Sequence, residues 1–367
     1  MYFRKSLYSL FVCFLSLISC HKKEEDNHVT PKQTTLFSYP SYFPSPVYDF
    51  DANPLDEKKF KLGRMLFYDP ILSLDSCISC SVCHQQTVAY STLNHQFSHG
   101  INGLPGTRNA PGLFNLAWYP YFTWDGGILN LEMQPLSPIS NPNEMAENLS
   151  NVLKKLNRHP LYKPRFKEAF EEDTINSQQV LKALAQYMVR IVSSGSKYDQ
   201  YKQGTASFSS DELAGLNIVR QKCSPCHGGE LFSDFQFRNI GLDSTALIVE
   251  DVGRELITNL PRDRRKYRTP SLRNITLTRP YFHDGRVSDI NNTLLYHGQQ
   301  DNPNLDPQLK TGGTLGIPLT DDQVSKIYTF LLTLADPVLL TDTTFSLQSS
   351  DFYPFSVQRG ANCGYVH

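Results

Sequence analysis

Cys80-Ser-Val-Cys83-His84 is a Cys-x-x-Cys-His unit, and the chain repeats it at Cys223-Ser-Pro-Cys226-His227. Two thiols three positions apart can form thioethers to the vinyl groups of a porphyrin, and the next histidine can ligate the iron. A zinc site built from the four cysteines would join ligands far apart in the chain, unlike compact zinc modules. A thioredoxin-like pair needs one Cys-x-x-Cys in a βαβ pattern, which the sequence lacks. The doubled unit therefore predicts two covalently bound c-type haems.

The first twenty residues have the features of an export signal. A basic start, 1–5, precedes the apolar run Leu7–Ile18, which is too short to span a bilayer as a mature helix. Leu17-Ile18-Ser19-Cys20 resembles the lipobox of bacterial lipoproteins, in which the cysteine is acylated. An ordinary signal peptide with an incidental Cys20 is the alternative. Because haem is attached outside the bacterial cytoplasm, we expect a periplasmic or cell-envelope protein, lipid-anchored through Cys20, in a membrane that the sequence does not identify.

Length and charge narrow the class of protein. Cleavage before Cys20 leaves about 348 residues, enough for two domains. The formal net charge of −1 favours neither nucleic acid nor an anionic membrane surface as a partner. Outside the leader and the haem units stand Cys77 and Cys363, which are either a disulfide or two free thiols.

The sequence predicts a mainly α fold with long loops. Residues 21–50 form an irregular linker, rich in Pro, Ser and Tyr over much of its length. No run of alternating strands is present. Apolar residues recur with helical spacing in five segments, Asp56–Phe67, Glu144–Asn157, Gln178–Ser193, Ser210–Lys222 and Asp321–Leu334.

The chain also repeats a pattern after each haem unit. Pro111-Gly-Leu-Phe-Asn115 follows the first unit and Pro270-Ser-Leu-Arg-Asn274 the second. Ten residues beyond each asparagine stands Asp-Gly, at Asp125 and at Asp284. Equal spacing after both units predicts two cytochrome c-like haem domains that arose by duplication.

From about residue 50 to 340 the chain resembles the bacterial dihaem cytochrome c peroxidase family, which includes the methylamine-utilisation dihaem enzymes. The resemblance implies an N-terminal peroxidatic haem domain at 51–204, a C-terminal electron-transfer haem domain at 205–340 and an extension at 341–367. It rests on the two haem units and on Arg108-Asn109-Ala110-Pro111, Trp124-Asp125-Gly126, Pro138 with Glu144-Met145, and Pro280-Tyr281-Phe282-His283-Asp284-Gly285.

The resemblance also implies roles for three side chains. Trp124 would lie between the haems, and Gln134 and Glu144 would lie over the peroxidatic iron. A carboxylate there can take a proton from one peroxide oxygen and return it to the other, while an amide orients the reactants. On sequence alone, Glu144 is equally well an acid at a helix N-terminus. Asn109, with the backbone oxygens of Thr278 and Pro280, matches the family's calcium site between the haems.

The chain departs from the family at both distal positions. Many members close the resting peroxidatic haem with a histidine where this chain has Ile101, with His95 and His99 out of register. We therefore expect an open iron that needs no reductive activation. None of the five methionines follows the second haem unit, so a methionine from that domain cannot ligate its iron. His297 is in register for that role, with Tyr296 beside it as the alternative.

The function expected from the resemblance is reduction of hydrogen peroxide to water with electrons from a small redox protein, a cytochrome c or a cupredoxin. The sequence leaves two other functions open. One is a methylamine-utilisation-like oxidase that acts on a partner protein, and the other is a dihaem electron carrier without turnover. A carrier needs no distal acid, so Glu144 and Gln134 favour the enzyme. A homodimer is one candidate assembly, and the sequence leaves the oligomeric state open.

Overall fold

The computed structural model describes residues 36–242, 250–297, 303–311 and 313–352, with residues 357, 360, 363 and 364. The predicted export signal and Cys20 lie outside these residues. Within them, no helix is both long and apolar enough to cross a membrane.

The fold is mainly helical, with long irregular loops, as the sequence predicts. The helices are α1 Glu57–Tyr68, α2 Cys80–Cys83, α3 Leu136–Ser140, α4 Leu149–Arg158, α5 Tyr162–Phe170, α6 Ser177–Val189, α7 Lys197–Lys202, α8 Ser210–Lys222, α9 Ser224–His227, α10 Glu255–Thr258, α11 Ile290–Leu295, α12 Asp321–Leu332 and α13 Pro337–Thr341. The strands of the described chain form two short antiparallel pairs, β1 Phe237–Arg238 with β2 Tyr267–Arg268, and β3 Lys310–Thr311 with β4 Thr314–Leu315.

Four of the five predicted helices form close to their expected bounds. Helix α1 begins after Asp56, whose carboxylate accepts from two N–H groups of the first turn. Ser209 caps α8 with Glu212 in a capping box, so that helix has the predicted bounds. Helix α12 ends two residues early. Helix α6 ends at Val189, four residues early. The N–H of Ser193, which a longer helix would bond to the carbonyl of Val189, donates instead to the side chain of Asn115 in a distant loop.

The helix predicted at Glu144–Asn157 is wrong in its first turn. Helix α4 begins at Leu149, after Asn148, whose side chain accepts from the N–H of Asn151. Ala146 has a φ of 51°, which an α-helix cannot contain. Glu144 therefore lies in a turn before the helix, so it is not an acid at a helix N-terminus.

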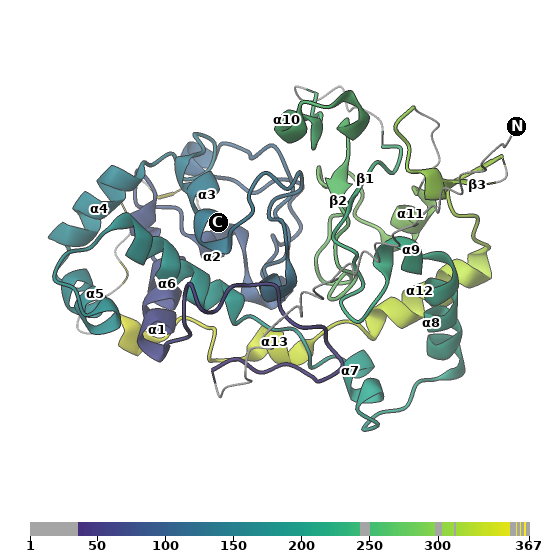
Figure 1. Ribbon diagram of the computed structural model, residues 1–367, viewed down its shortest axis with the longest axis horizontal. Helices are drawn as coiled ribbons and strands as arrows, with labels where there is room; N and C mark the ends of the chain where they lie inside the picture. Colours follow the sequence, from purple (N-terminus) through teal and green to yellow (C-terminus); the bar gives the residue numbers. More distant parts are fainter. Residues whose placement is uncertain are drawn as a thin grey trace, which may run out of the picture. The chain divides into compact units, whose positions relative to one another are not determined.

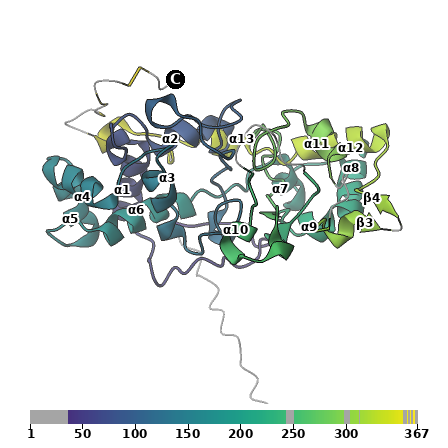
Figure 2. The same cartoon turned by 90° about the horizontal axis from the view of Figure 1, so that it is seen from above.

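Two crossed helix pairs organise the structure, α1 with α6 and α8 with α12, and Figures 1 and 2 show them well separated. A glycine sits at each crossing. A Cβ on Gly63 would lie 1.9 Å from the carbonyl oxygen of Ala183, and one on Gly215 would lie 2.0 Å from that of Lys326. Only glycine lets the two backbones of each pair approach so closely.

The two repeat asparagines serve equivalent positions. Asn115 and Asn274 both have a left-handed conformation, with φ of 56° and 57°. The side chain of Asn115 bonds the backbone N–H and C=O of Ser193, just after α6. The side chain of Asn274 accepts from the N–H of Asp336, just after α12. Each repeat asparagine thus connects its loop to the end of the second helix in its own pair.

Part of the predicted linker belongs to the core. Phe37, Tyr39 and Phe43 are buried and surround Trp118, with ring centroids 5.3 to 5.8 Å apart. The indole N–H of Trp118 donates to the carbonyl of Pro44. The segment is irregular, as predicted, but from residue 37 it packs as a structural element of the first half.

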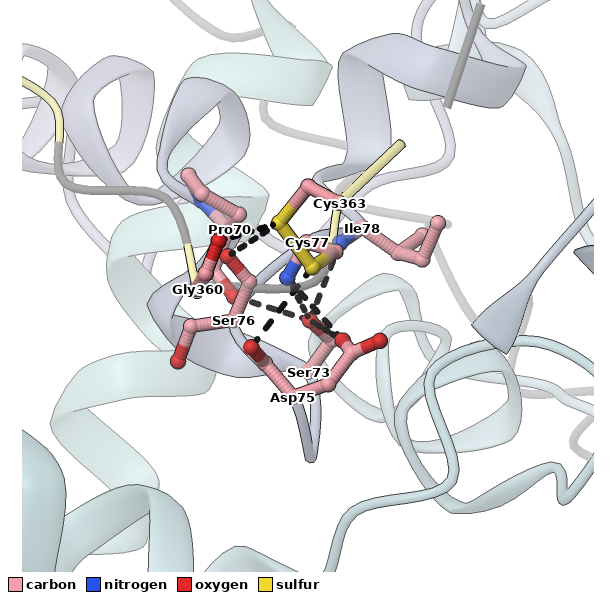
Figure 3. Close-up of a disulfide and its surroundings, with 8 residues drawn as sticks. All are labelled: Pro70, Ser73, Asp75, Ser76, Cys77, Ile78, Gly360 and Cys363. Atoms are coloured by element: carbon pink, nitrogen blue, oxygen red, sulfur yellow. Dashed lines mark hydrogen bonds between the residues drawn. A yellow bond between two sulfur atoms is a disulfide. The ribbon is translucent and has the colours of Figure 1, made fainter. Parts of the chain in front are cut away.

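The C-terminal extension returns to the first half. Arg64 of α1 makes a bidentate pair with Asp351, at 2.8 and 2.9 Å, with both side chains buried. Phe345 and Phe352 enter the same core. Cys363 forms a disulfide with Cys77, three residues before the first haem unit (Figure 3). The disulfide decides an alternative that the sequence left open.

Candidate functional site

The histidines of both Cys-x-x-Cys-His units are oriented in the same way. Nδ1 of His84 lies 2.9 Å from the carbonyl oxygen of Tyr90, and Nδ1 of His227 lies 3.1 Å from that of Phe232. A ring whose Nδ1–H donates to a carbonyl presents the lone pair of Nε2 to a metal. The four cysteines of the units, in and beside α2 and α9, are free thiols.

A large cavity lies beside the second unit. It encloses about 1870 Å³ of empty space, its open mouth included, and Cys223, Cys226 and His227 line it. Its apolar wall includes Val219, Leu242, Leu272, Ile290, Ile327 and Leu331. Two unbridged thiols, an oriented imidazole and an apolar space of this size fit a c-type haem.

His297 lies in the same cavity as His227. It follows the last turn of α11, and its Nδ1 lies 3.0 Å from the carbonyl oxygen of Thr293. Both imidazoles line the cavity, and burial, with the charge of His297 as a second cause, lowers the pKa of His227 to about 4. Tyr296 is 38% exposed and is not among the residues that line the cavity. The structure thus brings His297, rather than Tyr296, to the second haem unit.

Glu144 lies beside the first haem unit. Burial raises the pKa of the Cys83 thiol to about 11, and the charge of Glu144 adds to that rise. Burial also raises the pKa of Glu144 itself, while a 2.7 Å hydrogen bond from the amide of Asn141 opposes the rise. A carboxyl in this environment exchanges protons more readily near neutral pH than an exposed glutamate does.

Gln134 precedes α3, and the N–H of Met145 donates to the carbonyl of Pro138, so the turn that carries Glu144 folds back on α3. The side-chain oxygen Oε1 of Gln134 is buried and has no hydrogen-bond partner in the described part of the protein. A buried amide oxygen without a partner is costly unless a ligand supplies a donor.

Ile101 occupies the loop position where the family resemblance expects a histidine. Its side chain is buried, and its N–H donates to the carbonyl of Glu144 at 2.7 Å. A Cβ on Gly100 would lie 2.2 Å from the carbonyl oxygen of Asn143, so glycine is needed where this loop meets the turn. His95 and His99 are exposed, with ring centroids 5.4 Å apart.

Trp124 lies at the junction of the two halves and lines the cavity of the second unit. Its indole N–H donates to the carbonyl of Asn109. Two backbone hydrogen bonds, each 2.7 Å long, then cross the junction, from Asn109 N–H to the carbonyl of His283 and from Arg268 N–H to the carbonyl of Trp124. The repeat register pairs Asn109 with Arg268 and Trp124 with His283, so the two hydrogen bonds are equivalent.

The three residues predicted to bind calcium, Asn109, Thr278 and Pro280, line this cavity too. The amide of Asn109 donates to the carbonyl of Gln96 at 3.1 Å, which holds the side chain in place. No three His, Cys, Asp or Glu side chains of the described ranges gather as a metal site. A cation between the halves would therefore depend on amide and carbonyl oxygens, which suit calcium.

Sequence reasoning did not single out Arg268 or His283 as site residues. Both are buried polar residues of the cavity wall. The repeat could have indicated His283, because His283 occupies in the second copy the position that Trp124 occupies in the first. The sequence holds no comparable signal for Arg268, whose counterpart is the uncharged Asn109.

This fold, with two oriented Cys-x-x-Cys-His units and a tryptophan at their junction, defines a dihaem c-type protein. A family model described as di-haem cytochrome c peroxidase matches residues 57–207. Methylamine utilization protein MauG of Methylorubrum extorquens is 32% identical over 315 residues, which cover 83% of this chain and 85% of that protein. Cytochrome c551 peroxidase of Nitrosomonas europaea is 33% identical, with 77% and 81% covered. The chain therefore belongs to the di-haem cytochrome c peroxidase family.

Solved structures agree with this membership. The crystal structure of a MauG-like protein associated with microbial copper homeostasis has a TM-score of 0.75 and 31% identity, and covers 84% of this chain and 98% of that chain. The diheme peroxidase BthA of Burkholderia thailandensis has a TM-score of 0.67 over 84% of this chain and 91% of that chain. At 19% identity, BthA supports the fold alone.

Proposed function

We propose that the protein is a dihaem c-type peroxidase, which reduces hydrogen peroxide to water with two electrons from a small redox protein. The observation that carries the proposal is the half-buried carboxyl of Glu144 beside the first haem unit, hydrogen-bonded to Asn141, together with a buried amide oxygen of Gln134 that has no partner in the described part of the chain. An electron carrier has no use for such a pair. The family's cytochrome c peroxidases support the same reaction.

The first haem, bound at Cys80, Cys83 and His84, would supply the iron that accepts peroxide and the electrons that reduce it. Glu144 would take a proton from one oxygen of the peroxide and deliver it to the other oxygen, which leaves as water. Gln134 accepts a hydrogen bond from the bound peroxide through Oε1. Two further protons and two electrons complete the second water.

Ile101 leaves the distal side of the first haem without an imidazole. The exposed rings of His95 and His99 and the hydrogen bond from Ile101 to Glu144 support this assignment. We propose that the resting enzyme therefore reacts with peroxide at once, without prior reduction of the second haem.

The second haem, at Cys223, Cys226 and His227, would pass electrons from the donor towards the first. His297 is its proposed sixth ligand. Trp124 is proposed to couple the two sites, supported by its place in the cavity wall and its backbone bond to Arg268. A calcium ion on Asn109, Thr278 and Pro280 would hold the halves at this junction.

We propose two duplicated haem domains. The equivalent glycines, asparagines and junction hydrogen bonds of the two halves support duplication. The boundary we propose lies at Ser196 rather than 204, because Tyr198 of α7 packs in the second core and Asp199 pairs with the buried Arg273. We propose in addition that the leader is cleaved before an acylated Cys20, which anchors the enzyme in the cell envelope.

Steady-state peroxide consumption tests the function. Holoprotein made with a haem-attachment system should contain two haems that resist acid-acetone extraction. It should oxidise two molecules of reduced small cytochrome c or cupredoxin for each peroxide consumed. Extraction of the pigment, or no consumption with any donor of either class, contradicts the proposal.

Oxidation of a partner protein is the second candidate, favoured by the likeness to MauG and to the MauG-like crystal structure. The same assay separates the two functions. A peroxidase consumes peroxide with the reduced donor alone. A partner oxidase consumes peroxide without the reduced donor when its partner protein is present, and a side chain of that partner is oxidised instead.

A further inference from the structure

Two buried side chains of the second half have polar atoms without partners. Nε and Nη1 of Arg268 and Nδ1 of His283 are buried and make no hydrogen bond to any described residue. Arg268 is 4% exposed and His283 is 7% exposed, and both line the cavity of the second haem unit. A buried guanidinium without an anion is strongly destabilising, so the cavity must receive one.

The neighbouring carboxylates already have partners. Asp251 and Asp125 pair with Arg108, and Asp284 pairs with Arg286. The guanidinium of Arg268 instead lies over the ring of Tyr119, at 4.5 Å from its centroid. A ring face attracts a cation by about 0.5–2 kcal/mol, which does not replace a counter-ion. The anion must therefore come from what fills the cavity.

A haem brings such an anion. Cys223 and Cys226 use the two vinyl groups of the porphyrin, and the edge remote from the vinyl groups carries two propionates. Arginine matches a carboxylate through two parallel N–H bonds, and Nε with a terminal nitrogen is a suitable pair of donors. Nδ1 of His283 adds a third donor in the tautomer that carries the proton on that nitrogen. The ring stacks on Tyr267 at 3.7 Å, and its other nitrogen, Nε2, lies 3.9 Å from a carboxylate oxygen of Asp251.

We propose that Arg268 and His283 bind the propionate carboxylates of the second haem. This inference rests on the proposed two-haem function and goes beyond it, since it assigns a carboxylate-binding pair. The same Arg268 donates its backbone N–H to the carbonyl of Trp124. The haem carboxylates are thereby connected to the junction residue, so Arg268 is a positioning residue for electron transfer.

The test replaces the charge and measures the reduction potential of the second haem in the purified holoprotein. Arg268→Met removes the cation but keeps an apolar stem, and Arg268→Lys keeps the charge without the paired donors. His283→Phe keeps the stack on Tyr267 and removes both ring nitrogens, Nδ1 and the Nε2 that lies 3.9 Å from Asp251. Arg279→Met is the matched control, because Arg279 is an exposed arginine of the same segment.

Arg268→Met should lower the midpoint potential of the second haem, because the propionate charge is no longer neutralised. The propionate then titrates at higher pH, so the potential of the variant falls as the pH rises, while that of the parent and of Arg279→Met stays flat by comparison. Arg268→Lys should be intermediate, and His283→Phe should shift in the same direction by less. The charged or titratable groups that face the pair are Asp251, Asp284, Arg108, Arg286, Tyr119 and Tyr267, and they are common to all variants.

The haem content of the purified proteins distinguishes failure of the propionate assignment from failure of the proposed two-haem function. If Arg268→Met and His283→Phe both carry two haems per chain and keep the parent potential and its pH dependence, the propionate assignment is wrong. If the parent protein itself holds fewer than two covalent haems, the proposed function fails first. Should Arg268→Met not fold, Arg268→Lys and His283→Phe carry the same test.

Discussion

Glu144 shows how a residue acquires its chemistry from its surroundings. Its turn, and not a helix, presents the carboxyl beside Cys83, where burial raises its pKa. Ile101 from the preceding loop bonds the backbone of the same residue. The position and the pKa of this carboxyl are therefore both set by contacts with segments that precede Glu144 in the chain.

Glu144→Gln should lower kcat for peroxide by about 10²–10⁴-fold, because general acid–base groups contribute that much. Both haem spectra should be unchanged, since the amide is isosteric. Glu168→Gln on α5, a solvent-exposed acid, is the control and should keep parent activity. A Glu144→Gln enzyme with parent kcat would make the residue structural and favour the electron carrier.

The pH profile gives an independent measure of the same carboxyl. Glu144 must be ionised to take the first proton, so turnover falls as the pH drops through its pKa. Because the amide of Asn141 stabilises the ionised form, Asn141→Ala should move the acidic limb of kcat/KM to higher pH. A limb that stays in place, in a variant with intact spectra, would separate Glu144 from the rate-limiting proton transfer.

The sixth ligand of the second haem is testable at two adjacent residues. His297→Ala should convert that haem from low spin to high spin, while Tyr296→Phe should leave it low spin, because only His297 lines the cavity. No sulfur-to-iron band should appear in the near infrared, and imidazole in place of thioether should lower the potential. Observing that band, or high spin only in Tyr296→Phe, contradicts the assignment.

At the scale of elements, the crossing of α8 and α12 positions the second haem unit, since α8 leads directly to Cys223. Gly215→Val would place its Cβ 2.0 Å from the Lys326 carbonyl and force the helices apart. Overpacking costs about 1–3 kcal/mol, and a Cβ this close should cost near the upper end. A denaturant melt should record the loss, and haem content should fall at the second site only.

Gly106→Ala is the matched control for this crossing, because the nearest atom to its added Cβ is 3.6 Å away. The control should keep parent stability within about 0.5 kcal/mol, as surface changes usually do. Equal stability of Gly215→Val and Gly106→Ala would show that α8 and α12 separate without cost.

At the scale of the whole molecule, the C-terminal extension closes the chain onto its first half. The disulfide of Cys77 with Cys363 joins residues 286 positions apart (Figure 3). Cys363→Ser should lower the free energy of unfolding by about 2–5 kcal/mol, the usual effect of losing a native disulfide. Cys77→Ser should give the same loss, and the double variant no more, when measured by equilibrium denaturation. Unequal losses would mean that one cysteine stabilises the fold in another way.

Several features could be predicted from sequence because they depend on neighbouring residues. Each haem unit is a motif of five consecutive residues, and these residues alone supply the thiols and the histidine that a c-type haem needs. The capping box of Ser209 with Glu212 begins α8 at the predicted residue, since both partners lie within one turn. The repeat around Asn115 and Asn274 can be recognised in the sequence because both copies have the same ten-residue distance from the asparagine to Asp-Gly.

Other features were decided by tertiary structure alone. Glu144 lies outside helix α4, contrary to the prediction, because Ala146 has a positive φ and the helix begins only after its N-cap, Asn148. The spacing of apolar residues along the sequence does not reveal where the backbone takes a positive φ. The cavity brings together His297 and His227, which lie seventy positions apart in the chain. The sequence by itself determined which cofactor chemistry this protein carries, since that chemistry is local. Which side chains surround each cofactor depended on contacts between distant segments, and only the folded chain supplies those.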